Sequence, residues 1–430
     1  MSTTDLPGLT EPDAVAEGEH RLDRALGPYH LIMIGIGCII GAGIFVIAGT
    51  AAALHAGPAV LISFGFAALA CLFAGLCYAE FAAMIPVSGS AYTYAYATMG
   101  RFVAWFIGWN LVLEYGVSAS TVAVGWTGYF VSLLSIFGFD FPASLSNAPI
   151  AGAGPADLRW TGALINLPAT ILTLALTALL VVGMRASAQF NGAMVLIKTA
   201  IILLVILFGL PFVQPENLTP LIPPNEGEFG RFGWSGILAA SGLVFFAYIG
   251  FDSVSVAAQE AKNPQRDLPI GIIGSLAISA VLYVLMALVL VGITDYRMLN
   301  VPNPVSFAVN QVPELIWLAL PINLGALVGL ASVVFVSLYG QSRIFYCMAR
   351  DGFLWPLFGA VHPTYRTPYR GTVVTGVIAS VLAALFPLDI LADLVSIGTL
   401  LAFVVVCVGV MMLRVSAPDA RRPFRTQFVW

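Results

Sequence analysis

The sequence predicts an all-α integral membrane protein, with about ten transmembrane helices arranged as two inverted five-helix repeats. Three observations support this prediction: an apolar composition, ten stretches long enough to span a bilayer, and glycine interruptions at corresponding positions of two of them. Of the 430 residues, 59% are hydrophobic and only 9% are Asp, Glu, Lys or Arg, whereas a soluble domain carries about 25% charged residues. This composition excludes a soluble enzyme, a disordered protein and a nucleic-acid binder.

Ten apolar stretches approach or exceed the roughly 20 residues that a spanning helix needs. Their approximate ranges are 28–54, 57–82, 98–135, 159–183, 187–213, 235–260, 269–293, 316–349, 371–387 and 390–413. They divide the chain into an N-terminal segment at 1–26, a first repeat at 27–213, a second repeat at 235–413 and a basic tail at 414–430.

Positive charge predicts the orientation of these helices. With the N-terminus inside, the cytoplasmic segments collect 14 of the 18 Lys and Arg residues, the external segments collect three, and Lys198 lies within a span. Cytoplasmic loops of membrane proteins carry the excess of Lys and Arg. We therefore expect both termini on the cytoplasmic side of the membrane.

The first and sixth stretches contain residues that disfavour a continuous helix. The first holds Gly35, Gly37, Gly41 and Gly43 within nine residues, and each glycine costs up to about 1 kcal/mol relative to alanine in a helix. Close packing and an unwound segment at Gly41–Gly43 both explain this pattern. The sixth stretch is interrupted at Gly250–Asp252. Because matched interruptions in two halves are typical of secondary transporters, we favour unwinding. Five helices per half is an odd number, so the repeats are inverted.

A pair of unwound helices suits a zwitterion such as an amino acid. Its carboxylate can accept from the freed amides of the resumed first helix, and its ammonium group can donate to freed carbonyls near both breaks. The predicted substrate-binding residues are Ile40, Gly41, Ala42, Gly43, Ile44, Phe246, Ile249, Asp252 and Ser337, the last of which contributes to pocket volume.

Ionisable residues inside the spans are costly and therefore need a reason. Lys198 either tethers the fifth helix to carbonyls of the broken first helix or exchanges a proton, and we favour a coupling role. Asp252 faces the pocket, carries a proton or is a structurally bound acid. We expect Glu114 in a buried network away from the substrate, and we predict that Lys198, Glu114 and Asp252 couple transport to protons. Glu80 and Glu260 lie near cytoplasmic helix ends, where a gate or interfacial pairing is expected.

Signatures of an enzyme are absent from the sequence. The five cysteines and four histidines form no CxxC or HExxH pattern, and no GxSxG, Walker or kinase motif occurs. We therefore expect no catalytic residues, metal, cofactor or nucleic acid. The expected partners are an amino acid substrate, protons and the lipid bilayer, and the sequence predicts no oligomeric state.

Five motifs give the chain a family resemblance. They are Ile40–Phe45 (IGAGIF), Tyr78–Tyr94, Gly250–Asp252 (GFD), Lys262–Pro269 (KNPQRDLP) and Tyr339–Arg343 (YGQSR). With these motifs the chain resembles the amino acid–polyamine–organocation (APC) superfamily, most closely the bacterial relatives of the cationic amino acid transporters. The resemblance implies the LeuT-like fold of inverted repeats, alternating access, and an amino acid bound between helices one, three, six and eight.

The resemblance also implies roles for single residues. Lys198 matches the family's helix-five lysine, which takes the place of sodium in related sodium symporters and favours proton coupling. Asp252 and Glu114 match acidic positions of the pocket and proton pathway. Where the family usually has Thr or Ser, this chain has Ala42. The family typically has twelve or more helices, whereas only residues 414–430 follow the tenth predicted helix here. Two alternatives remain: a stable ten-helix protein or a truncated product.

The leading functional hypothesis is a proton-coupled symporter or exchanger of L-amino acids in a bacterial inner membrane. Its alternatives are a sodium-coupled symporter and an amino acid-binding membrane sensor or subunit that does not transport. The sequence does not predict whether the substrate is cationic or small and neutral, nor the direction of flux. Symport and exchange both remain open at this point.

Overall fold

The computed structural model describes residues 26–427 except 87–89, 153–157, 183–187 and 366. The N-terminal segment expected at 1–26 lies outside the described residues apart from Leu26, and so do the last three residues of the tail. The described chain is predominantly helical, and it includes a short antiparallel strand pair of β1 (Ile150–Ala151) and β2 (Arg159–Trp160).

The α-helices follow the chain in sixteen numbered segments. They are α1 (Pro28–Ile39), α2 (Ala48–Ala51), α3 (Val60–Met84), α4 (Ser90–Met99), α5 (Arg101–Leu111), α6 (Ser118–Ile136), α7 (Ala143–Ser146), α8 (Leu167–Val182), α9 (Ala188–Gly209), α10 (Gly233–Val244), α11 (Ser253–Val256), α12 (Pro264–Ile293), α13 (Pro304–Asn310), α14 (Ala319–Arg350), α15 (Tyr369–Leu385) and α16 (Leu388–Ser416). π-Helical segments cover Gly43–Ile47, Ala52–Ala56 and Val112–Val117. Short 3₁₀ segments cover Gly57–Ala59, Leu210–Phe212, Pro215–Leu218, Phe245–Tyr248, Ala258–Glu260, Tyr296–Met298, Pro313–Leu318 and Pro356–Gly359.

Each of the ten predicted stretches overlaps a helix of the structure. In the described residues, seven helical stretches are long and apolar enough to cross a membrane, and the shorter apolar helices are α1, α8 and α15. The fourth stretch was predicted to begin eight residues too early. Residues 159–160 form β2 instead, and α8 starts only at Leu167, where the Asn166 side chain accepts from the Ala169 amide as a helix N-cap.

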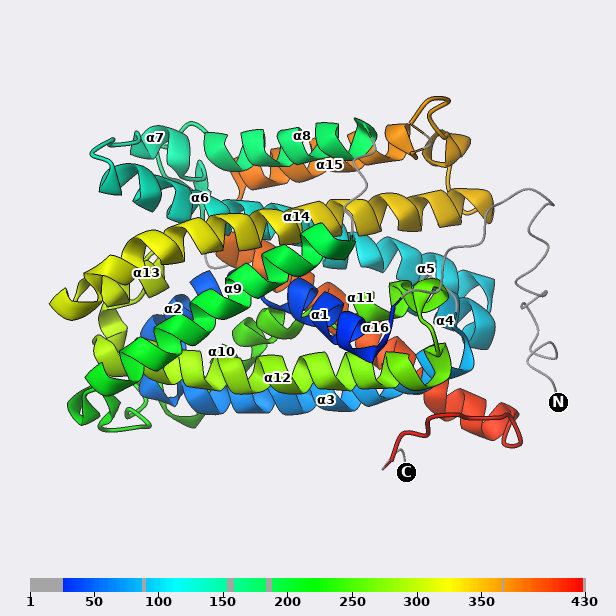
Figure 1. The fold of residues 1–430 in the computed structure, drawn as a ribbon, viewed down its shortest axis with the longest axis horizontal. Helices are drawn as coiled ribbons and strands as arrows, with labels where there is room; N and C mark the ends of the chain where they lie inside the picture. The colour runs from blue at the N-terminus through cyan, green and yellow to red at the C-terminus, as the bar shows by residue number, and fades with distance from the viewer. Residues whose placement is uncertain (1–25, 87–89, 153–157, 183–187, 366, 428–430) are drawn as a thin grey trace.

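The long helices run along the long axis of the molecule (Figure 1). α3 and α12 pack side by side along one face, and α8 packs on α15 at the opposite face. α1 packs against α12 and α9 in the middle of the molecule. Large apolar side chains such as Phe66, Phe73 and Phe102 are exposed on the outside, where lipid can cover them.

The first and sixth helices are both interrupted, each close to the predicted place. α1 ends at Ile39, Ile40 has an extended backbone, and helical structure resumes at Ala42. α10 passes through the 3₁₀ turn Phe245–Tyr248, Ile249 is extended, and helix resumes at Ser253 in α11. The second interruption includes the predicted Gly250–Asp252 segment. The first lies at Ile40–Gly41, one residue before the predicted Gly41–Gly43 segment, because Ala42 and Gly43 are already helical.

The glycines of the first helix serve both of the purposes that the sequence left open. A Cβ on Gly35 would lie 2.3 Å from the Ser275 hydroxyl, and one on Gly43 would lie 2.2 Å from the Ala247 Cα atom, so these two allow close packing. A Cβ on Gly41 would meet Val333 at an ordinary 3.5 Å. Gly41 is therefore the glycine of the break itself, whereas its neighbours make room for other helices.

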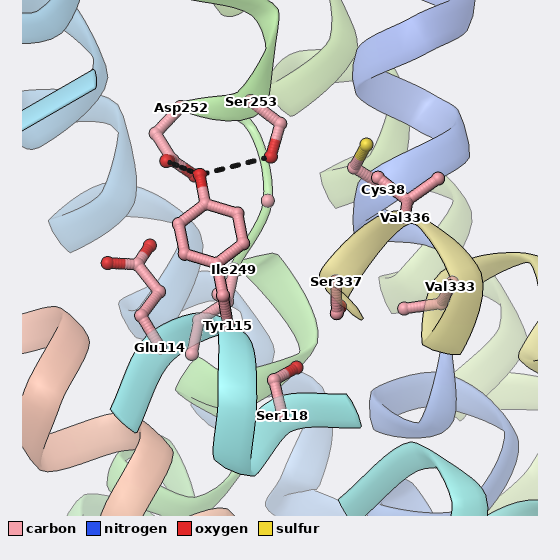
Figure 2. Close-up of a pocket in the computed structure, with 11 residues that line it drawn as sticks. Cys38, Glu114, Tyr115, Ser118, Ile249, Asp252, Ser253, Val333, Val336 and Ser337 are labelled. Atoms are coloured by element: carbon pink, nitrogen blue, oxygen red, sulfur yellow. Dashed lines mark hydrogen bonds between the residues drawn. The ribbon is translucent and has the colours of Figure 1, made fainter. Parts of the chain in front are cut away.

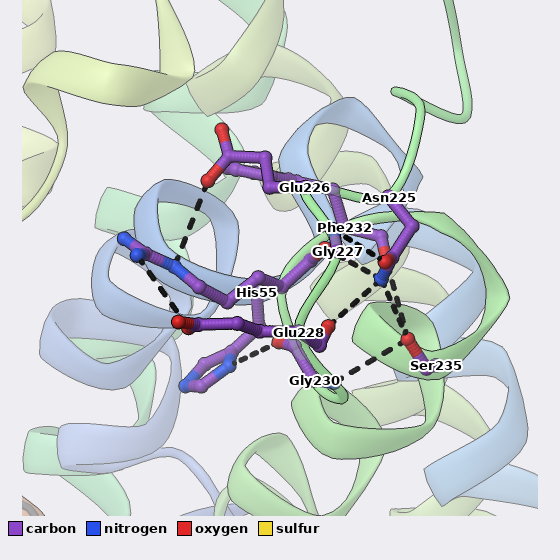
Figure 3. Close-up of polar contacts among 9 residues, drawn as sticks. His55, Asn225, Glu226, Gly227, Glu228, Gly230, Phe232 and Ser235 are labelled. Atoms are coloured by element: carbon purple, nitrogen blue, oxygen red, sulfur yellow. Dashed lines mark hydrogen bonds and ion pairs between the residues drawn. The ribbon is translucent and has the colours of Figure 1, made fainter.

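A loop at residues 225–232 connects one end of the first interrupted helix, at His55, with the start of α10 (Figure 3). The His55 carbonyl, just before the turn into α3, accepts from the Phe232 amide at 2.8 Å, and its ring Nδ1 contacts the Gly230 carbonyl at 2.8 Å. The Asn225 side chain organises the loop by donating to the carbonyls of Arg231 and Phe232. The half-helix 42–56 and α10 are thus joined through backbone contacts.

Candidate functional site

The two interruptions face each other at the centre of the molecule. Gly250 has φ +115°, and a Cβ at this position would lie 2.9–3.0 Å from the backbone and side chain of Cys38. Gly43 packs in the same way on Ala247. Only glycine permits both the backbone conformation at 250 and this close approach. The sequence therefore brings the two interrupted helices into direct contact beside their breaks.

A small cavity of about 30 Å³ opens beside this contact (Figure 2). Its walls come from the interrupted first and sixth helices, the π-helical turn before α6, and α14. The lining residues are Cys38, Glu114, Tyr115, Ser118, Ile249, Gly250, Asp252, Ser253, Val333, Val336 and Ser337.

A second cavity of about 20 Å³ lies directly at the first break. It shares Cys38, Ser118, Ile249 and Val333 with the first cavity, so the two spaces adjoin. The other lining residues are Ile39, Gly41, Ala42, Gly43, Val122 and Phe246. The amides that begin the resumed helix have no intrahelical acceptor, and they make this smaller cavity suited to an anionic group.

Lys198 holds the carbonyl end of the first break. Its fully buried ammonium group donates to the Ile40 carbonyl at 2.9 Å and to the Gly37 carbonyl. The stem of the side chain packs on Gly329 of α14, where a Cβ would lie 3.3 Å from it. Lys198 lines neither cavity, so it acts on the site through the backbone of α1.

Asp252 lies at the start of α11 and is held by two hydroxyl groups. Its Oδ2 atom accepts from the Tyr115 hydroxyl at 2.7 Å and from the Ser90 hydroxyl at 3.1 Å. The Oδ1 atom is buried and has no hydrogen-bond partner among the described residues. No basic side chain of the described chain pairs with Asp252. The carboxyl group therefore retains one acceptor for a proton or a ligand.

The position of Glu114 differs from the sequence-based expectation. It was expected in a buried network away from the substrate, but it lines the larger cavity, and neither carboxyl oxygen has a hydrogen-bond partner in the described part of the chain. Its position follows from the π-helical turn Val112–Val117, a geometry that often occurs at functional sites. The turn brings Glu114 and Tyr115 to the wall of the same cavity.

The predicted binding residues divide into those that line a cavity and those that do not. Gly41, Ala42, Gly43, Phe246, Ile249, Asp252 and Ser337 line one of the two cavities. Ile40 and Ile44 line neither, and both are fully buried. The Ile40 carbonyl accepts from Lys198, and the Phe246 carbonyl accepts from the Ile249 amide at 3.3 Å. Both carbonyls are therefore already partnered.

Sequence reasoning missed several lining residues. They are Cys38, Tyr115, Ser118, Gly250, Ser253, Val333 and Val336 in the larger cavity, together with Ile39 and Val122 in the smaller one. Helical spacing could have found two of them: Ser118 is four residues after Glu114, and Val333 is four residues before Ser337. Residues at this spacing share a helix face.

Comparison with known proteins identifies the family. The model of a family described as amino acid permease matches residues 26–430. The chain belongs to the amino acid permease family. The methylthioribose transporter of Bacillus subtilis (strain 168) is 46% identical over 408 residues, or 95% of this chain and 85% of that protein. The branched-chain amino acid permease BcaP of the same organism is 45% identical, over 96% of this chain and 85% of that protein.

More distant relatives agree with this assignment. The vacuolar cationic amino acid transporter 4 of Arabidopsis thaliana is 38% identical, over 94% of this chain and 65% of that protein. The fold is similar to the crystal structure of MhsT in complex with L-phenylalanine, with a TM-score of 0.62 and 14% identity over 93% of this chain and 91% of that one. This permease is thus a helical integral membrane transporter, and it is not an enzyme.

Proposed function

We propose that this permease carries an L-amino acid across the bacterial cytoplasmic membrane by proton-coupled symport or exchange. The observation that carries the proposal is the cavity at two facing helix breaks, with helix-start amides at one end and two carboxyl groups at the other. The amides suit a substrate carboxylate. The Ile40 and Phe246 carbonyls already have hydrogen-bond partners. The substrate's ammonium group therefore binds other acceptors, on the sixth helix.

The proposed topology has ten spans in two inverted five-helix repeats, with both termini in the cytoplasm. The first repeat occupies 27–213 and the second 235–413, as the spacing of the breaks indicates. Transport then follows from rocking of the first, second, sixth and seventh spans, which are α1 with residues 42–56, α3, α10 with α11, and α12, against the other spans. The substrate site lies between the two groups and opens to one side at a time.

The coupling ion in this proposal is the proton. Lys198 already places a positive charge on carbonyls of the first break, and such freed carbonyls are where a sodium ion would bind in a broken helix. Glu114 and Asp252 hold unpartnered carboxyl oxygens beside the cavity, so they can accept and release a proton as the substrate enters and leaves.

Uptake into proteoliposomes tests the proposal. The purified full chain is reconstituted without sodium, and uptake of radiolabelled amino acids is measured with and without an inward proton gradient. We expect one or a few amino acids to accumulate, and the gradient to stimulate their uptake. Uptake that requires sodium and ignores the proton gradient would contradict the coupling. Binding without uptake would support the amino acid-binding sensor instead.

A thiosugar is the second candidate substrate, because a relative that is 46% identical is named as a methylthioribose transporter. The same assay distinguishes the two classes when unlabelled methylthioribose is added as a competitor. We expect a branched-chain or cationic amino acid to compete more strongly, because the helix-start amides at the smaller cavity suit a carboxylate, which methylthioribose lacks. Selective uptake of the thiosugar would overturn the amino acid assignment.

A further inference from the structure

A buried charged cluster lies far from the substrate cavity, at the end of the molecule where α16 and the tail meet α3. The Glu80 side chain on α3 is only 2% exposed, and its Oε2 atom accepts from the Arg414 guanidinium of α16 at 2.7 Å. The Arg422 Nε atom of the tail lies 3.3 Å from the Oε1 atom of Glu80. The two arginine side chains are only 8% and 9% exposed. One carboxylate thus joins two cations from a different part of the chain.

The tail contributes more than one charge to this cluster. The Thr426 amide donates to Glu80 Oε2 at 2.7 Å, and its hydroxyl donates to the Leu76 carbonyl of α3 at 2.8 Å. Arg422 donates to the carbonyls of Leu413 and Ala417, where α16 ends. Arg422 therefore caps the end of α16, and Arg422 and Thr426 bind α3.

These contacts cross the boundary between the two groups of helices that the proposed mechanism moves. α3 packs on α12, which also packs on α1, so Glu80 belongs to the rocking group. α16 packs on α4, α5, α6 and the π-helical turn 112–117, so Arg414 belongs to the other group. Any rotation of one group away from the other at this end must lengthen the contacts of Glu80.

A short chain of contacts connects the cluster with the substrate cavity. Phe81, next to Glu80, stacks on Tyr94 of α4 with ring centroids 4.9 Å apart. α4 begins at Ser90, whose hydroxyl donates to Asp252 at 3.1 Å. A change in the position of α3 therefore reaches the carboxyl group that lines the cavity, through two packed side chains and one helix.

We propose that residues 414–427 form a clasp on Glu80 that holds this end of the permease closed, and that the clasp must release before the substrate site opens toward the cytoplasm. This inference rests on the proposed alternating-access mechanism. The clasp differs from a surface ion pair because its charges are buried. Removing the Glu80 carboxylate leaves the Arg414 and Arg422 guanidinium groups buried without their counter-charge, so the closed state is lost sharply rather than gradually.

Hydrogen–deuterium exchange on the full chain in lipid nanodiscs tests the clasp without measuring transport. Arg422→Gln removes the charge of the tail, and Glu80→Gln removes the charge of α3 with little change in shape. In both variants we expect exchange to rise at least about tenfold in the tail and in the end of α3, and also in α4 and α1, because opening follows release. Arg425→Gln is the matched control, since it removes an exposed charge from the same tail.

The pattern of exchange decides the outcome. Faster exchange confined to residues 414–427 would show that the tail only caps α16, and it would overturn the proposal. In the double variant Glu80→Gln with Arg422→Gln, exchange should rise by less than the sum of the two single effects, because the two residues share one contact. Fully additive effects would also count against the clasp. Should the exchange pattern be as expected while every variant and the wild type lack uptake, the clasp would stand and the proposed transport would fail.

Discussion

The two broken helices are stabilised in different ways. The first break, at Ile40 and Gly41, has no charged side chain of its own, and a lysine from a distant helix holds its carbonyls. The second break carries a glycine with φ +115° and its own carboxyl group, Asp252, two residues later. The first break therefore takes its charge from another helix, whereas the second carries its own carboxyl group, which hydroxyl groups of other helices hold.

This difference also gives the two breaks opposite polarity. The first presents helix-start amides, and the Lys198 ammonium group binds the carbonyls of Gly37 and Ile40 just before them. The second presents carboxyl and hydroxyl oxygens to the larger cavity. A zwitterion fits between two such segments, and the carboxyl groups of the acidic side can bind a proton. The comparison leads to four predictions, in order of decreasing effect.

The largest effect is expected at Lys198, because no other cation contacts the first break in the part of the chain that the structure describes. Lys198→Ala leaves two buried carbonyls without their charged donor, and hydrogen bonds to charged groups contribute about 1.5–3 kcal/mol each. We expect uptake to fall about 100-fold or more, measured as initial rates in proteoliposomes. Thr199→Ala, at the next position of α9, is the matched control. Sodium-dependent uptake that survives Lys198→Ala would refute the role of this lysine.

The second prediction compares one glycine from each break. Gly250→Ala places a Cβ 2.9–3.0 Å from Cys38 at a backbone angle of φ +115°, which costs on the order of 1–3 kcal/mol. Gly41→Ala meets only Val333 at 3.5 Å. We expect Gly250→Ala to lower the thermal stability of the purified protein. We expect Gly41→Ala to fold normally but to bind substrate about tenfold more weakly, because its methyl group enters the smaller cavity. Equal thermal stability of the two variants would contradict this distinction.

The third prediction tests the acidic side of the site. Asp252→Asn keeps an oxygen acceptor for the hydroxyl groups of Tyr115 and Ser90, so the fold should change little. An amide cannot carry the proton, and we therefore expect stimulation by the proton gradient to disappear while substrate exchange continues. The measurement is the ratio of gradient-driven uptake to exchange in the same vesicles. A normal response to the gradient would leave Glu114 as the better candidate for the proton carrier.

Much of this architecture follows from the sequence, and the exceptions have physical causes. Apolar length located the helices, since each must satisfy its own backbone groups in lipid, and glycine patterns located both breaks. Cavity walls were harder to predict: Glu114 reaches the cavity through a π-helical turn, which leaves no composition signal. Ile40 was assigned to the substrate, but its carbonyl belongs to Lys198. A partner 158 residues away in the chain is visible only after folding.

The smallest effect is expected in the loop that joins the far ends of the two broken helices. Arg231 makes ion pairs with Glu226 at 3.7 Å and Glu228 at 3.8 Å, but its side chain is 50% exposed. Exposed pairs contribute about 0–1 kcal/mol, so Arg231→Ala should leave thermal stability and uptake nearly unchanged. Asn225→Ala should cost more, about 1–2 kcal/mol, because this amide bonds several loop carbonyls. A larger loss for Arg231→Ala would mean that charge, rather than backbone contact, couples the two helices at this end.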